Sequence, residues 1–132
     1  MSATSDESPL DPRAVELAQS LLDDAREGRT ERLAAHVDAG VPVDLTDASG
    51  NTALMLAAYH GHAGTVAALV ERGASVDALN DRGQSPLAGA VFKGEDDVVR
   101  TLLDAGADPD AGHPTARQTA EMFGRTDLVG PA

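Results

Sequence analysis

Residues of one type recur every 33 positions along this chain of 132 residues. Glycine does so twice and aspartate once, at Gly28, Gly61 and Gly94, at Gly40, Gly73 and Gly106, and at Asp44, Asp77 and Asp110. A fixed period of about 20 to 50 residues is the signature of repeat proteins, in which each unit packs only on its neighbours. The period therefore predicts a solenoid.

The two central units, residues 47–79 and 80–112, agree over their whole length. Thr52 and Ser85 are good N-cap residues, and Pro86 suits a first helical position, so a short helix should follow each cap and end at the next turn glycine. A second helix is expected over 63–72 and again over 96–105. Each second helix carries apolar residues on one side only, so the units must stack to bury them.

One stretch of the central unit reads G-x-T-A-L-x-L-A-A-x-x-G-H and continues as V-x-x-L-V-x-x-G-A-x-V-D-A. This pattern resembles the ankyrin repeat, and the likeness covers about residues 13 to 129. The resemblance implies an all-α solenoid of about four helix-turn-helix repeats with short β-hairpin fingers. It also implies a concave surface, formed by the fingers and first helices, that binds other proteins and does not usually catalyse reactions.

The end units are weaker matches, as expected of caps that turn a polar face to water. We expect an acidic, flexible tail at 1–10, one domain at 11–129 and a C-terminal end at 130–132, with repeats at about 12–46, 47–79, 80–112 and 113–129. The last unit fits only if three residues are deleted, which predicts a short last hairpin and a stub in place of the final helix. Part of the apolar stripe of Val98, Val99, Leu102 and Leu103 should then stay partly uncovered.

Two departures from the family pattern affect stability. The family has a histidine that bonds neighbouring hairpins, and the equivalent residues here are Met55, Ala88 and Gln118. Gly89 replaces an expected leucine inside a first helix, which costs about 1 kcal/mol in helix propensity. We expect the third repeat to be the least stable.

The three aromatic residues of the chain, Tyr59, Phe92 and Phe123, all lie one or two positions before a turn glycine. In the ankyrin layout this position lies at the end of the helix that lines the groove, so the three would form one column of binding anchors. Alternatively, Tyr59 and Phe92 only fill the gap between adjacent first helices. The resemblance adds three flanking residues and six finger residues to the surface: His60, Lys93 and Arg26, then Ala48, Ser49, Asn51, Asp81, Arg82 and Gln84.

A net charge of −12 repels nucleic acid and anionic lipid, and either favours a partner with a basic patch or simply confers solubility. There are no cysteines, which excludes disulfides and leaves the redox compartment unconstrained. We see neither a secretory leader nor a membrane span, so we expect a cytoplasmic protein. We also expect a monomer. The Ala-, Arg-, Asp- and Gly-rich composition with a single lysine suggests a bacterial source.

The sequence offers little for catalysis or for a cofactor. His60 and His62 flank a turn glycine without a second group of metal ligands nearby, and His62 is better explained as the family's turn histidine, which ties down backbone. We expect His36 to be half-buried in the first repeat. Neither a serine nucleophile elbow nor a phosphate-binding glycine loop occurs.

We therefore predict a protein–protein interaction module that is not an enzyme and needs no cofactor. It would use a preformed concave groove and its fingers. The alternative is a structural or assembly subunit, docked permanently on a larger enzyme or on a second copy through the uncovered edge from Val98 to Leu103.

Overall fold

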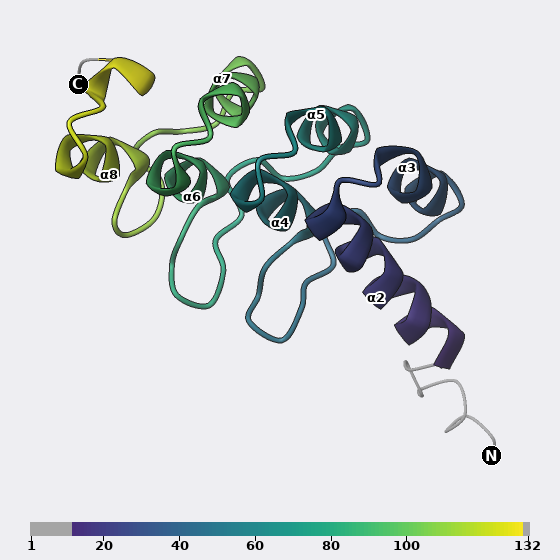
Figure 1. The fold of residues 1–132 in the computed structure, drawn as a ribbon. Coiled ribbons are helices and arrows are strands. Elements are labelled where there is room, and N and C mark those ends of the chain that lie inside the picture. The colour runs from purple at the N-terminus through teal and green to yellow at the C-terminus, as the bar shows by residue number, and fades with distance from the viewer. Residues whose placement is uncertain (1–11, 131–132) are drawn as a thin grey trace.

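The computed structural model describes residues 12–130 and shows a helical solenoid, as the period predicts (Figure 1). The expected tail at 1–10 lies outside the described residues. The helices are α2 (Pro12–Glu27), α3 (Thr30–Asp38), α4 (Ala53–Tyr59), α5 (Ala63–Glu71), α6 (Pro86–Lys93), α7 (Asp96–Asp104) and α8 (Ala116–Met122), followed by the short 3₁₀ helix η1 (Thr126–Leu128).

The helices form two rows. The inner row stacks α2, α4, α6 and α8 in that order, and the outer row holds α3, α5 and α7, with η1 against the end of α7 (Figure 1). Each inner helix also packs on the outer helix that follows it. Every unit is therefore covered by its sequence neighbours, which is the arrangement that a fixed repeat period requires.

The inner helices begin at the predicted caps. The side-chain oxygen of Thr52 accepts a hydrogen bond from the Met55 N–H at 3.2 Å, and Ser85 accepts one from the Ala88 N–H at 3.0 Å. Pro86 occupies the start of α6, and Gly94 ends this helix in the left-handed conformation at φ 72°. These local signals explain why the predicted helix bounds agree closely with the structure.

Small and medium aliphatic side chains fill the interior. Fully buried leucines alternate along the stack with alanines, which let neighbouring helices approach closely. The leucines with no exposed surface are Leu21, Leu33, Leu54, Leu69, Leu87 and Leu102.

The apolar stripe on α7 is uncovered only in part, at Leu103. Val98 and Val99 are each 1% exposed and Leu102 is fully buried, while Leu103 is half-buried. The outer helix packs between α5 and η1, and the last turns add Leu128 and Val129 to the core. The edge on which the alternative function depends is therefore reduced to Leu103.

The open face of α8 is polar. Allowing for the three-residue deletion, Arg117, Gln118 and Glu121 stand where Leu87, Ala88 and Val91 are buried in α6. Arg117 forms an ion pair with Asp110 at 2.9 Å, and Gln118 completes a capping box with Thr115. The expected polar cap is therefore present at this end of the stack.

The fingers are long loops with little strand pairing. Residues 39–52 and 72–85 link the first three helix pairs, and the last link, 105–115, is three residues shorter as predicted. Within the described residues the β-hairpin strands are not formed, and the pairing consists of one isolated bridge between Thr46 and Thr52.

Candidate protein-interaction surface

All three aromatic side chains of the chain are exposed on the inner row. Tyr59 is 39% exposed, Phe92 55% and Phe123 51%, and Met122 beside them is 68% exposed. Tyr59 and Phe92 lie near the C-terminal ends of α4 and α6, while Met122 ends α8 and Phe123 caps it. We call the set Tyr59, Phe92, Lys93, Met122 and Phe123 the aromatic ladder.

The ladder has a different register from the predicted column. Tyr59, Phe92 and Met122 each lie two residues before a turn glycine, whereas Phe123 lies one residue before Gly124 and is equivalent to Lys93. Met122 was not predicted because the column was chosen by aromatic residue type. The position two residues before the turn glycine, which Met122 shares with Tyr59 and Phe92, would have identified it.

Each step of the ladder contacts the one before it. The Lys93 ammonium lies 4.9 Å from the centre of the Tyr59 ring, which is a favourable cation–π distance. The Phe123 ring meets Phe92 edge to face, with ring centres 5.6 Å apart. His60 meets the edge of the Tyr59 ring at 5.7 Å. In both contacts between repeats, the residue directly before the turn glycine, Lys93 or Phe123, contacts the aromatic ring of the previous repeat.

The predicted finger residues form a second strip. They lie on loops that enter the N-terminal ends of α4 and α6, whereas the ladder lies toward the C-terminal ends, about 10 Å away for helices of this length. Five of the six are exposed and one is half-buried: Ala48, Ser49, Asp81, Arg82 and Gln84, and then Asn51. Fingers and ladder therefore border the inner row on opposite sides.

Amide and carboxylate side chains hold the fingers together. Asp47 accepts hydrogen bonds from the N–H groups of Ser49 and Asn51, both at 2.9 Å, and Asn80 does the same for Arg82 and Gln84. The Asn80 side chain also donates to the Asn51 side chain at 2.9 Å. This amide pair links neighbouring fingers where the family's histidine is missing.

The pKa of Asp47 differs from that of an ordinary surface carboxylate. Partial burial raises the pKa of Asp47, but the backbone hydrogen bonds from Asn51 and Ser49, the side-chain hydrogen bond from Asn51 and the charge of Arg26 together bring the net pKa below the usual value. Arg26 lies 3.7 Å away. Asp47 is therefore ionised at neutral pH.

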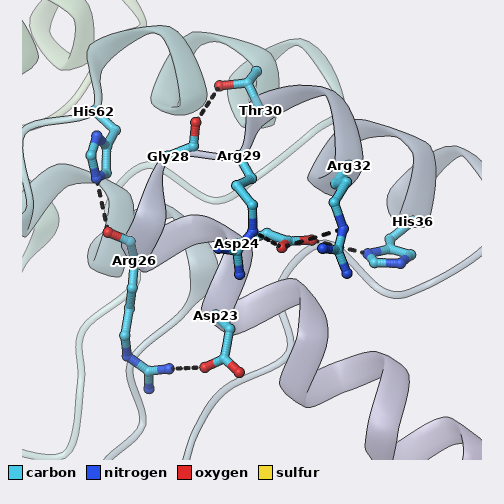
Figure 2. Close-up of polar contacts among 9 residues, drawn as sticks. All are labelled: Asp23, Asp24, Arg26, Gly28, Arg29, Thr30, Arg32, His36 and His62. Carbon is cyan, nitrogen blue, oxygen red and sulfur yellow. Dashed lines mark hydrogen bonds and ion pairs between the residues drawn. The ribbon is translucent and has the colours of Figure 1, made fainter.

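A buried carboxylate joins the first two helices (Figure 2). The side chain of Asp24 on α2 is fully buried and accepts a hydrogen bond from Arg29 Nε at 2.8 Å. Arg32 Nε lies 3.8 Å away, and His36 Nδ1 lies 3.4 Å from the other Asp24 oxygen. The bond to Asp24 raises the pKa of Arg29. The sequence analysis missed this cluster, although it placed His36 correctly as half-buried.

His62 has the predicted role of tying down backbone. Its Nε2 lies 2.8 Å from the Arg26 carbonyl oxygen, and its ring covers Gly28, where a Cβ would come within 2.6 Å of the imidazole (Figure 2). Gly28 has a φ of 73°, which also favours glycine. His62 therefore links α5 to the end of α2.

Two shallow hollows lie away from the ladder. One, of about 500 Å³, lies between α2 and the first finger, and its lining includes Arg26, which pairs with Asp23 and Asp47. The other, of about 270 Å³, lies between α7 and η1. In the part of the chain that the structure describes, no three His, Cys, Asp or Glu side chains are placed to hold a metal ion.

Of the described helices, none combines the length and apolar character needed to cross a membrane.

A family model described as ankyrin repeats, in three copies, matches residues 15–113. Over 53 residues the chain is 42% identical to a protein of Pseudomonas aeruginosa named as an ankyrin repeat protein. The match covers 40% of this chain and 31% of that relative, so the chain spans about a third of the relative's length.

Proposed function

Because this chain belongs to the ankyrin repeat family, whose members are generally protein–protein interaction modules and typically not enzymes, we propose that it binds a partner protein through the aromatic ladder, with the fingers contributing to specificity. The observation that carries the proposal is the exposure of every aromatic side chain of the chain on this one surface.

Exposed aromatic residues in a row are favourable anchors. Aromatic side chains bury a large area on association and lose little conformational entropy, so they dominate many interfaces. The ladder contacts also hold the Phe92 and Tyr59 rings in place before a partner arrives. A preformed surface of this kind reduces the cost of binding.

The competing explanation is that the rings only fill space between first helices. Their exposure argues against a purely packing role, since a ring that fills a gap is largely removed from water. Ala53, Ala57 and Ala90 already allow α4 and α6 to pack closely. The binding role accounts for the exposed rings without further assumptions.

Affinity capture tests the proposal. Immobilised full-length protein would be mixed with lysate of its source cells, and captured proteins would be quantified by mass spectrometry. The double variant Phe92→Ala/Phe123→Ala should lose most of the captured partner, because hot-spot truncation costs more than about 1 kcal/mol per anchor.

The matched control is Leu17→Ala, an exposed apolar residue on α2, outside the ladder. This variant should capture the partner like the native protein. Equal capture by the native protein and the ladder variant would rule out the ladder as the binding surface. A cytoplasmic location, a monomeric state and a partner with a basic patch remain predictions.

A further inference from the structure

The ladder has a regular spacing set by the fold. Tyr59 lies on α4, Phe92 on α6, and Met122 and Phe123 at the end of α8, and these three helices are successive neighbours in the inner row. Packed helices lie about 8 to 10 Å apart. The ladder therefore offers an anchor roughly every 8 to 10 Å along the stack.

The spacing of the ladder matches the repeat of an α-helix better than that of an extended strand. A helix rises about 1.5 Å per residue, so side chains seven residues apart lie about 10 Å apart on the same face. On an extended strand, side chains of one face repeat at about 6.6 Å and then at about 13 Å, which fits the ladder at neither interval.

The ladder is also two side chains wide. Its first step pairs Tyr59 with Lys93, and its second pairs Phe92 with Phe123. An amphipathic helix presents an apolar stripe of similar width, made of residues three, four and seven apart. A polyproline helix has a suitable repeat of about 9 Å, but it docks into slots lined by aromatic rings. Here Lys93 and Phe123 occupy the spaces between steps.

The charge of the chain favours a cationic partner. Seven arginines each have an aspartate oxygen within 3.8 Å: Arg26, Arg29, Arg32, Arg72, Arg100, Arg117 and Arg125. Most of the positive charge is thus neutralised locally, and the net charge of −12 leaves a negative field. A basic segment would approach faster and bind more tightly than an acidic one.

We infer that the partner presents an amphipathic α-helix that lies along the ladder, with apolar side chains seven residues apart facing the rings and Lys or Arg at its flanks. This inference rests on the proposed function, because it specifies what the same surface binds. It differs from that function in naming the backbone conformation and the charge of the bound segment.

The test uses a display library of random 20-residue peptides selected on the full-length protein. Parallel selections use Tyr59→Ser/Phe92→Ser and Met122→Ser/Phe123→Ser, each checked for folding by circular dichroism. The second variant changes only residues more than half exposed, which protects the fold if the first pair unfolds. Ladder-dependent peptides should be recovered at least about tenfold less on the variants.

The recovered sequences should show apolar residues at i, i+3 or i+4, and i+7, with a net positive charge. A proline placed at the centre of a recovered peptide should reduce its affinity at least about tenfold, because proline breaks a helix. Alternating apolar residues, proline at every third position or net negative charge in the ladder-dependent peptides would overturn the helical partner and leave the proposed function standing. Recovery of peptides equally on native protein and both variants would overturn both.

Discussion

The interior of the stack and the aromatic ladder are built from different side chains. Leucine, alanine and valine fill the interior, while the chain's one tyrosine and two phenylalanines lie outside it with Met122. Thin helical layers leave no room for rings between close-packed backbones. The interior accounts for stability, and we propose that the ladder accounts for binding, so the two contributions can be measured separately.

The largest expected effect is on the interior. Leu69→Ala removes a fully buried side chain from α5 and leaves a cavity, so the free energy of unfolding should fall by about 2 to 5 kcal/mol. Urea unfolding followed by circular dichroism measures this. Leu17→Ala, on an exposed residue of the same type, should cost less than about 1 kcal/mol. Similar losses in both variants would contradict the assignment of stability to the interior.

The next largest effect is expected at the buried carboxylate of Asp24, which joins α2 to α3. Asp24→Ala removes a fully buried carboxylate and its hydrogen bond to Arg29, so we expect a loss of about 2 kcal/mol in the free energy of unfolding. The adjacent Asp23 is exposed and pairs only with Arg26 in the described part of the chain, so Asp23→Ala should cost less than about 1 kcal/mol. A loss for Asp23→Ala as large as for Asp24→Ala would show that burial of the carboxylate is unimportant.

Gly89 lies where the interior meets the ladder, in the middle of α6. A Cβ at this position would lie 3.6 Å from Tyr59 Cδ1, which is ordinary contact, so Gly89→Ala should stabilise the fold by about 1 kcal/mol. Gly94→Ala is the matched control, because φ of 72° there should make the same change destabilising. Thermal unfolding of both variants would check the opposite signs, and destabilisation by Gly89→Ala would show that the ladder is packed more tightly than described.

The smallest expected effect is a pH-dependent difference between the first two fingers, in which Asp47 and Asn80 accept equivalent hydrogen bonds from the backbone. The folded-state pKa of Asp47 lies below the ordinary value of 3.8, so its stabilisation is present above that value and is lost as pH falls through the folded pKa. Asn80 makes the equivalent bonds without titrating. As the pH falls below 3.8 and through the folded pKa of Asp47, amide exchange at Ser49 and Asn51 should increase relative to exchange at Arg82 and Gln84. Asp47→Asn should abolish this difference, and its persistence in that variant would contradict the assignment.

The features that the sequence predicted correctly depend on neighbouring residues. Caps, the left-handed glycine of α6, the short last loop and the stub follow from residue types at fixed offsets within one repeat. Such signals act within a few residues, so they can be interpreted without knowing what packs on them. The repeat period then extends them along the chain.

The features that the sequence missed depend on tertiary packing. Asp23 and Asp24 are adjacent aspartates on one helix, and only the position of α3 decides which of them is buried. Leu128 and Val129 pack against the hydrophobic core although η1 is too short to show a helical pattern. Met122 was not predicted because it is not aromatic, although it occupies the same repeat position as Tyr59 and Phe92.

The central claim is that the ladder binds and the interior stabilises. The double variant Tyr59→Ala/Phe92→Ala tests this when its free energy of unfolding is measured beside its affinity for the captured partner. We predict binding weaker by more than about 1 kcal/mol, with unfolding changed by less than about 1 kcal/mol because Tyr59 is 39% exposed and Phe92 55%. An unfolded double variant, or a folded one with native affinity, would contradict the account.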